Sequence, residues 1–317
     1  MAPDITKHNP LACLLKASPA LFCRYRQSYH CLRHPGMNEP SMSNPDIINL
    51  RAQAIEQYIR DTTGIELPVT VHAEVASTND WAIDHCRGGG AAPFACFARS
   101  QTQGRGRRGK SWLMMPDASI AMSLCWVFDS AVDANLLPLT IAMSIVRTLE
   151  SAGLDRVAIK WPNDVFAADR KIAGILIDAI PRKQKHQKAY IIGVGVNYDM
   201  SGMEQELSGI PYTDICRETG TDDRPGDCPE MQTLAQQLLG NIMADCQRYA
   251  TSSQQALASF RDDYDYCHMK QLEIRLDDGR CLSGESHGVN DKAELCVKVD
   301  DEIIHINSAE VSIRVQR

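Results

Sequence analysis

Closely spaced cysteine pairs are absent from this sequence of 317 residues. It contains 12 cysteines but no C-x-x-C motif, and their spacing is irregular. Structural zinc sites and redox dithiols typically use such pairs, so neither is predicted and no tightly bound metal is expected. Cys125 and Cys296 lie in apolar runs and are expected to be small core side chains. Without a recognisable signal peptide, this cysteine usage favours a reducing cytoplasm.

Long apolar segments and a surplus of basic residues are also absent. The longest early apolar run, residues 11–15, is followed by Lys16 and Pro19 and is too short for a signal sequence or a membrane span. We therefore expect no membrane association. The net charge of −7 argues against broad binding to DNA or RNA, which requires many Lys and Arg side chains. A small cationic site for phosphate groups remains compatible with this charge.

The remaining composition is that of a globular protein, and the chain divides into three segments. Hydrophobic residues make up 44% and charged residues 23%. Residues 1–45 show neither helical nor strand periodicity and are predicted to be a disordered leader. Residues 46–267 alternate helical and strand patterns, and residues 268–317 contain only short strands with turn residues between them. We expect a mixed-sheet α/β catalytic domain followed by a small closed β-barrel.

The helices and strands of the larger domain follow from hydrophobic periodicity. The first helix is predicted to begin after Asp46, which is a good N-cap residue. One further helix is expected in the middle of this domain and two near its end, and the predicted strands lie between the first helix and the last two. The predicted strands are 69–75, 94–98, 120–128, 157–161, 171–180 and 190–196, and the later helices are 136–152, 234–249 and 254–264.

A loop rich in glycine and arginine, QTQGRGRRGKSW at residues 101–112, lies between two predicted strands. Glycine allows successive backbone N–H groups to point into one concavity, and guanidinium groups donate paired hydrogen bonds to phosphate oxygens. The loop is therefore predicted to be a mobile lid over the phosphates of a nucleotide. A solvated loop or an RNA-binding tether is the alternative interpretation of this loop alone.

Two lysines flank a predicted turn in the segment KWPND…KIAGIL. Lys160 ends one strand and Lys171 begins the next, so a hairpin can bring both ammonium groups to one end of the sheet. Lysines in that position stabilise negative charge where a carboxylate meets a phosphoryl group. Asp164 is a candidate to hold Mg²⁺ or to orient an incoming amine. Solvated turn residues would produce the same pattern.

Two shorter segments complete the set. Gly193 and Gly195 interrupt the strand IIGVGVN, and glycine within a strand often marks a close approach by a ligand or by another chain. A packing role explains each glycine equally well. Ser77, Thr78 and Asn79 carry hydroxyl and amide groups that suit a ureido ring, although an ordinary helix cap explains them equally well.

Taken together and in this order, the segments STN, QTQGRGRRGKSW, KWPND with KIAGIL, and GVGVN resemble the biotin protein ligases. The resemblance runs from about residue 47 to the C-terminus. It implies a core related to class II aminoacyl-tRNA synthetases. It also implies two half-reactions, in which biotin and MgATP first form biotinyl-5′-AMP. A lysine of a biotin carboxyl carrier protein, a subunit of acetyl-CoA carboxylase, then accepts the biotin.

The resemblance also assigns roles to residues of this sequence. The catalytic residues would be Lys171, Arg107, Lys160 and Asp164, with Asp164 also the candidate Mg²⁺ ligand. The biotin contacts would be Ser77, Thr78, Asn79, Gln101, Arg105, Gly106, Arg107 and Lys171. The contacts to ATP and the adenylate would be Gly104, Arg105, Gly106, Arg107, Arg108, Gly109, Lys110, Trp112, Asn163 and Asn197.

Three positions depart from the usual pattern of this family. Lys110 replaces a common arginine, so the charge is kept but the forked geometry is lost. Asp117 stands in a glycine-like place and is expected to alter how the lid folds. Asp178 replaces a common glutamate.

Other functions compete with this interpretation. A lipoate or other acyl-protein ligase would use the same fold, but the Gly–Arg lid with KWPND favours biotin. Some members of the family are also biotin-responsive repressors. Because nothing before Asp46 resembles two amphipathic helices with a basic recognition helix, we predict no DNA binding. A dimer formed through exposed strand edges is left open.

Overall fold

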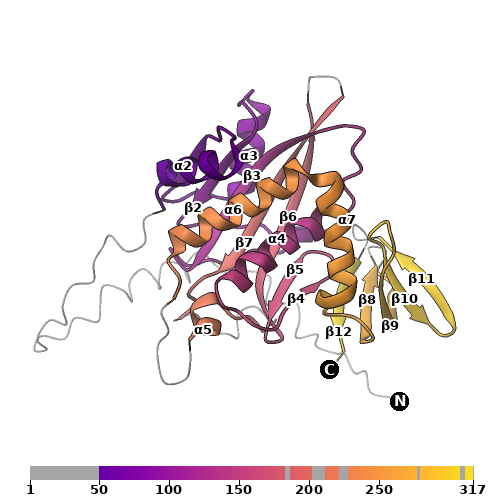
Figure 1. Cartoon of the computed structure of the whole chain (residues 1–317). Helices are drawn as coiled ribbons and strands as arrows, with labels where there is room; N and C mark the ends of the chain where they lie inside the picture. Colours follow the sequence, from indigo (N-terminus) through magenta and orange to yellow (C-terminus); the bar gives the residue numbers. More distant parts are fainter. Residues whose placement is uncertain are drawn as a thin grey trace, which may run out of the picture. The chain divides into compact units, whose positions relative to one another are not determined.

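The larger of two sheets contains seven strands, and the computed structural model describes it within residues 50–182, 186–201, 211–220, 228–276, 279–307 and 311–316 (Figure 1). The predicted leader and the Asp46 cap lie outside these ranges. The strands are ordered β1-β2-β3-β7-β6-β5-β4; β1 runs parallel to β2, and every other pair is antiparallel. Their bounds are β1 Val69–His72, β2 Phe94–Ala98, β3 Ser119–Asp129, β4 Val157–Lys160, β5 Asp164–Ala167, β6 Arg170–Pro181 and β7 Gln187–Asn197.

Alternation along the strands produces two faces of this sheet. In β2, Ala95 and Phe97 belong to one buried cluster, whereas Phe94 and Cys96 belong to another. The first and larger cluster lies under the helices α2 (Ala52–Thr63), α4 (Leu137–Ser151), α6 (Met231–Gln247) and α7 (Tyr249–Ser259). The second lies under α3 (Thr78–Arg87), whose Ala82 it includes. The α3 face is the one on which the functional groups gather.

The first helix differs from the prediction in where it begins. Helix α2 starts at Ala52, and its N-cap residue, Arg51, has an extended backbone and no side-chain cap. The carboxamide of Gln232 in α6 instead accepts a hydrogen bond from Arg51 N at 2.7 Å. A tertiary contact between residues 181 positions apart therefore replaces the local cap that the sequence suggested.

The predicted hairpin between Lys160 and Lys171 contains an additional strand. β5 pairs with β4 on one side and with β6 on the other, so the two lysine-bearing strands are not neighbours. The prediction of a direct hairpin was wrong because Asp164–Ala167 has only four residues, too few to show a strand periodicity. Lys160 pairs directly with Asp164 across the β4–β5 ladder.

The C-terminal segment forms a five-stranded antiparallel sheet, which fits the predicted small β domain. The edge strands of this sheet, β11 and β12, are not paired with each other in the described residues, so the predicted closure into a barrel is not observed. The strand order is β11-β10-β9-β8-β12. Two side chains join this sheet to the core: Trp161 Nε1 donates to Ala293 O at 2.9 Å, and Arg261 pairs with Asp291 at 2.9 Å. The bounds are β8 Gln271–Leu276, β9 Cys281–Val289, β10 Leu295–Val299, β11 Glu302–Ile306 and β12 Val311–Val315.

Two cysteines form a bond that the sequence did not indicate. Cys216, in the short helix α5 (Ile215–Thr219), is joined by a disulfide to Cys228, 12 residues further along the chain. Cys125 is buried as predicted, whereas Cys296 is half-buried and faces His305. Within the ranges described above, no helix is both long and apolar enough to cross a membrane.

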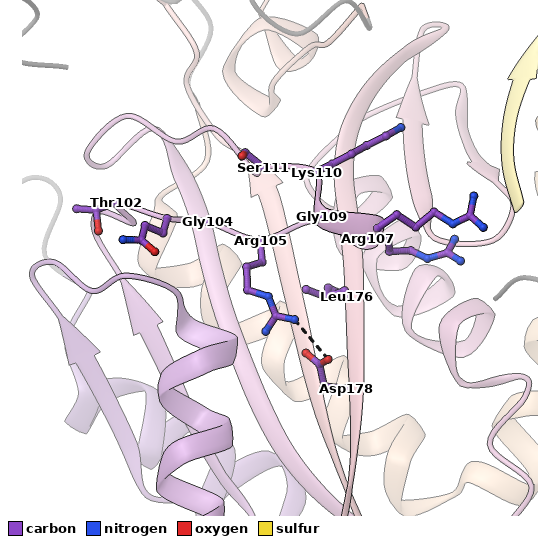
Figure 2. Close-up of a pocket in the computed structure, with 12 residues that line it drawn as sticks. Thr102, Gly104, Arg105, Arg107, Gly109, Lys110, Ser111, Leu176 and Asp178 are labelled. Carbon is purple, nitrogen blue, oxygen red and sulfur yellow. Dashed lines mark ion pairs between the residues drawn. The ribbon is translucent and has the colours of Figure 1, made fainter. Parts of the chain in front are cut away.

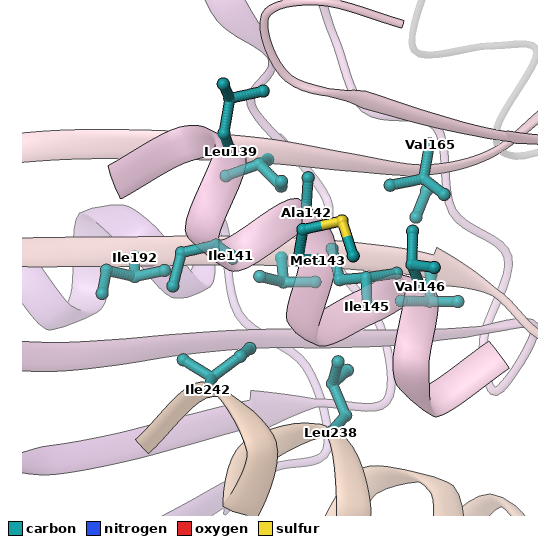
Figure 3. Close-up of a cluster of buried hydrophobic side chains, with 14 of the residues drawn as sticks. Leu139, Ile141, Ala142, Met143, Ile145, Val146, Val165, Ile192, Leu238 and Ile242 are labelled. Carbon is teal, nitrogen blue, oxygen red and sulfur yellow. The ribbon is translucent and has the colours of Figure 1, made fainter. Parts of the chain in front are cut away.

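The packing of α4 against α6 generates a stability prediction (Figure 3). Ile145 of α4 is completely buried in the same cluster as Leu238 and Ile242 of α6. Replacing Ile145 by Ala leaves a cavity that should lower the free energy of unfolding by about 2–5 kcal/mol in urea denaturation. Ile303→Ala, at a side chain that is 46% exposed, is the control and should change it by less than about 1 kcal/mol. Equal losses from the two variants would contradict this assignment of the core.

Candidate active site

A cavity of about 700 Å³ lies beneath the glycine–arginine loop on the α3 face of the sheet (Figure 2). Its walls are the loop from Thr102 to Ser111 together with Leu176 and Asp178 of β6. Figure 2 shows the Arg105 side chain pointing from the loop toward Asp178. The predicted lid therefore does cover a cavity large enough for a small-molecule ligand.

The lid is a narrow hairpin with its own hydrogen bonds. Gly106 N donates to Lys110 O at 2.7 Å, and Trp112 N donates to Gly104 O at 2.8 Å. A Cβ atom at Gly104 would lie 2.4 Å from Trp112 O, so only glycine fits there. The tip turns through Arg108 and Gly109, whose φ angles of 57° and 71° lie in the left-handed region. The two glycines thus permit the narrow base and the tight tip.

Arginine side chains fasten both sides of the lid to the body of the domain. Arg105 Nη1 lies 2.5 Å from Asp80 Oδ1, and its Nη2 lies 3.6 Å from Asp178 Oδ1. On the other side, Arg107 donates to Asn163 Oδ1 at 3.0 Å. These contacts hold the lid over the cavity.

A buried polar network lies at the start of α3. Ser77 caps the helix by accepting from Asp80 N, as the helix-cap interpretation predicted. Thr78 N donates to Gln101 Oε1 at 2.8 Å. Ser123 Oγ lies 2.6 Å from Asn79 Oδ1 and 2.9 Å from Thr78 Oγ1, so its single proton can serve either oxygen. The network brings the predicted Ser-Thr-Asn motif and Gln101 together in one place.

The orientation of the Asn79 amide is fixed by three partners. Its Nδ2 donates to Leu176 O at 3.2 Å and to Asp178 Oδ2 at 3.0 Å, while Oδ1 faces Ser123. Both amide protons are thus used by the protein, and Oδ1, which accepts from Ser123, has a second lone pair. Asp178 is shared between this amide and the lid arginine.

The glycines of β7 allow two side chains to lie directly on the sheet. A Cβ atom at Gly193 would lie 2.1 Å from Asn79 Oδ1, and one at Gly195 would lie 2.6 Å from the Trp112 ring. The expected close approach is therefore confirmed as an approach by other parts of the chain. The indole Nε1 of Trp112 is buried and has no hydrogen-bond partner among the described residues.

Positive charge gathers around one carboxylate, that of Asp164 at the start of β5. Lys171 Nζ lies 2.7 Å from Asp164 Oδ1 and 5.6 Å from the centre of the Trp112 ring. Burial lowers the pKa of Lys160; Asp164 opposes this effect, and repulsion from Lys171 and Lys110 adds to it. Despite the intervening strand, the two predicted lysines thus share one site, with a surplus of cations over Asp164.

The main chain around Lys171 is held by the segment that precedes α5. Lys171 N donates to Pro211 O, and Thr213 N donates to Lys171 O, both at 2.9 Å. Asn197 Nδ2 donates to Thr213 O at 2.9 Å. Asn197, predicted to contact the nucleotide, is therefore placed to support Lys171, and its contact with a nucleotide stays a prediction.

One departure from the family pattern has a clear structural outcome. Asp117 has φ 60°, so it does occupy a glycine-like position. Its carboxylate forms two hydrogen bonds with the guanidinium of Arg99, at 2.8 and 2.6 Å, and its N–H donates to Arg99 O. These bonds offset the strain of the left-handed backbone.

The fit of a divalent metal at Asp164 can be judged from its neighbours. Oδ1 of Asp164 is bonded to Lys171 and also accepts from Asn163 Nδ2 at 3.2 Å. Over the described ranges, no group of three or more His, Cys, Asp or Glu side chains lies close enough to hold a metal ion. A single carboxylate among lysines is a poor Mg²⁺ site, so the ion would enter with the phosphates of a nucleotide.

Comparison with known proteins shows which proteins this arrangement resembles. Residues 75–197, which include the whole lid and both lysines, match the model of the biotin/lipoate A/B protein ligase family. The chain is 28% identical over 248 residues to the bifunctional ligase/repressor BirA of Escherichia coli, covering 78% of this chain and 74% of that protein. It is 36% identical over 155 residues to a biotin–[acetyl-CoA-carboxylase] ligase of Paracoccus denitrificans, and the match covers 47% of this chain and 62% of that protein. Residues 75–197 of this chain are therefore similar to the biotin/lipoate A/B protein ligase family.

A solved structure supports the fold. A biotin protein ligase from Aquifex aeolicus in complex with biotin and ATP superposes with a TM-score of 0.63 at 21% identity, covering 78% of this chain and 99% of that one. At this level of identity the likeness concerns the fold. It confirms the expectation of a mixed α/β core with a second, smaller β unit at the C-terminus.

Two residues of the site were not predicted from the sequence. Asp80 directly follows the Ser-Thr-Asn motif, and only the structure shows that it meets Arg105. Ser123 is a polar residue inside the apolar run IAMSLCW, and that interruption is a signal that the sequence contained. Because Ser123 is fully buried, its hydroxyl needs partners, and Thr78 and Asn79 provide them.

The contact between Gly195 and Trp112 generates a prediction. Gly195→Ala should displace the Trp112 ring and lower the free energy of unfolding by about 1–3 kcal/mol, because the new methyl group overlaps the indole. The matched control is the same substitution in a Trp112→Ala background, where no overlap remains and the added cost should fall below about 0.5 kcal/mol. Equal costs in both backgrounds, measured by urea denaturation, would show that Trp112 does not lie on β7.

Proposed function

We propose that this protein is a biotin protein ligase that forms biotinyl-5′-AMP from biotin and MgATP and then transfers biotin to a lysine of an acceptor protein. The observation that carries the proposal is the presence of two chemically different groups of residues near the cavity that the lid covers. One is the buried network of Thr78, Asn79 and Gln101. The other is Lys171 and Lys160 with the carboxylate of Asp164.

In the first half-reaction, a carboxylate oxygen of biotin attacks the α-phosphorus of ATP and pyrophosphate leaves. The polar network would hold the ureido ring, with Asn79 Oδ1 accepting an N–H of the ring. Lys171 would lie between the carboxylate and the α-phosphate, where two negative groups must meet. Lys160 and Lys110 would neutralise the remaining phosphate charge, and Arg107 would close the lid over it. The buried N–H of Trp112 is a further donor near Lys171.

In the second half-reaction, the ε-amine of the acceptor lysine attacks the carbonyl carbon of the mixed anhydride and AMP leaves. We expect Asp164, whose Oδ1 lies 2.7 Å from Lys171 Nζ, to orient this amine. The proposed acceptor is a biotin carboxyl carrier domain. Two relatives support this acceptor, because both are named as biotin–[acetyl-CoA-carboxylase] ligases. They are the Paracoccus protein and a Mycobacterium tuberculosis protein that is 25% identical over 247 residues. A cytoplasmic location completes the proposal.

Exchange of labelled pyrophosphate into ATP tests the first half-reaction. The purified protein should catalyse exchange that depends on biotin and not on lipoate, assayed in parallel with Mg²⁺ present. Exchange with lipoate alone would keep the family and change the substrate. Absence of exchange with either acid, in a protein whose folding is verified by circular dichroism, would refute the proposal.

Removal of Lys171 tests the proposed reaction centre. Lys171→Ala should lower kcat for biotin-dependent exchange by at least about 100-fold, because it removes the cation between two anionic groups. Lys188→Ala, at an exposed position of β7, is the control and should leave the rate within a factor of two. Near-normal exchange by the Lys171 variant would remove this lysine from the mechanism.

The lowered pKa of Lys160 generates a pH prediction. As pH rises through that lowered pKa, Lys160 loses its proton, so the KM for ATP should increase at a pH below the usual titration of lysine. The folded state gains stability over the same range, because the penalty for burying the ammonium disappears between the lowered pKa and the ordinary one.

Two variants isolate this lysine in the same exchange assay. Lys160→Arg should abolish the alkaline increase in KM, because guanidinium stays protonated. Lys160→Gln should give a raised KM that does not vary with pH through this group. An identical pH dependence in wild type and Lys160→Arg would assign the titration to another residue.

A further inference from the structure

Arg105 is held between two carboxylates, an arrangement that the proposed reaction does not explain. Its guanidinium lies 2.5 Å from Asp80 and 3.6 Å from Asp178, two carboxylates that come from different elements, α3 and β6. A guanidinium flanked by two carboxylates has its charge balanced by the protein. Arg105 is thereby distinguished from Lys160, whose ammonium is destabilised mainly by burial, and to a lesser extent by Lys171 and Lys110.

The position of the two carboxylates links the lid to the buried polar network at the start of α3. Asp80 is the third residue of α3 and follows Asn79 directly. Asp178 accepts from Asn79 Nδ2 at 3.0 Å through one oxygen and faces Arg105 with the other. The same amide whose Oδ1 is proposed to accept from the ureido ring is thus in contact with the group that holds the lid.

We propose that Asp80 and Asp178 are positioning residues that clamp the lid through Arg105 and so set how long the activated acyl group is retained. This inference rests on the proposed function, since retention matters when a reactive adenylate must survive until the acceptor arrives. The carboxylates act through Arg105. The phosphate groups would bind at the opposite side of the lid, near Arg107, Lys110, Lys160 and Lys171.

The exposure of the pair determines how the clamp should respond to salt. The Arg105 and Asp80 side chains are 38% and 46% exposed, so dissolved ions can screen their attraction. The Asp178 contact is longer, and its side chain is 28% exposed. Release of the adenylate from the wild-type protein should therefore accelerate as ionic strength increases, whereas a protein without the Asp80 charge should show a weaker dependence.

The experiment measures release of labelled biotinyl-5′-AMP after the adenylate is formed without acceptor and chased with unlabelled ligand. Asp80→Asn and Arg105→Gln should each increase the release rate by about 3–10-fold, and the double variant should release no faster than the faster single variant. Asp80→Glu keeps the charge and should restore at least half of the retention. Asp84→Asn, one turn further along α3 and exposed, is the matched control.

A second readout keeps the clamp testable even if the proposed function fails. Cleavage of the ligand-free protein by trypsin within residues 105–110, mapped by mass spectrometry, should be several-fold faster in Asp80→Asn and in Asp178→Asn. Thermal melting of each variant separates this effect from general destabilisation. Unchanged cleavage and unchanged release in variants that melt with the wild type would overturn the clamp, whereas absence of pyrophosphate exchange by the wild type would overturn only the proposed function.

Discussion

The bare backbone of β7 is the constraint on which the rest of the site depends. At Gly193 the amide of Asn79 lies against the strand, and at Gly195 the indole of Trp112 does so. A methyl group at either position would raise these side chains off the sheet. Asn79 would then lose its place beside Ser123 and Asp178, and the base of the lid, which is bonded through Trp112 N, would move with the ring. The absence of side chains at Gly193 and Gly195 thus determines how closely Asn79 and Trp112 approach the sheet.

Charge divides the lid into two sides with different chemistry. On one side, Arg105 is neutralised by carboxylates and serves attachment. On the other, Arg107 contacts the neutral carboxamide of Asn163 near the lysines. A loop whose arginines were all paired with carboxylates would close firmly but offer nothing to an anion. A loop with none would lack a fixed position in the absence of ligand.

The sequence predicted the site more completely than it predicted the connections within it. Short motifs with special backbone or charge requirements, such as the lid glycines and Lys171, can be recognised in the sequence because few other residue types can replace them. The strand Asp164–Ala167 was missed, because four residues carry no periodicity. The start of α2 was misplaced, because its cap comes from Gln232 in a helix far along the chain. Asp80, likewise, gains its partner only from the folded chain.

The order of strands in the larger sheet also bears on how the protein forms during synthesis. β3 pairs with β2 along one edge, but its other edge is covered by β7, which is made after β4, β5 and β6. Until residue 197 has left the ribosome, the long apolar strand Ser119–Asp129 has an open edge. The hydrogen bond from Arg51 N to the Gln232 carboxamide forms later still, because residue 232 must first be synthesised. Nascent chains of this protein therefore expose the edge of an aggregation-prone strand from the synthesis of residue 129 until that of residue 197, which gives chaperones a defined segment to protect.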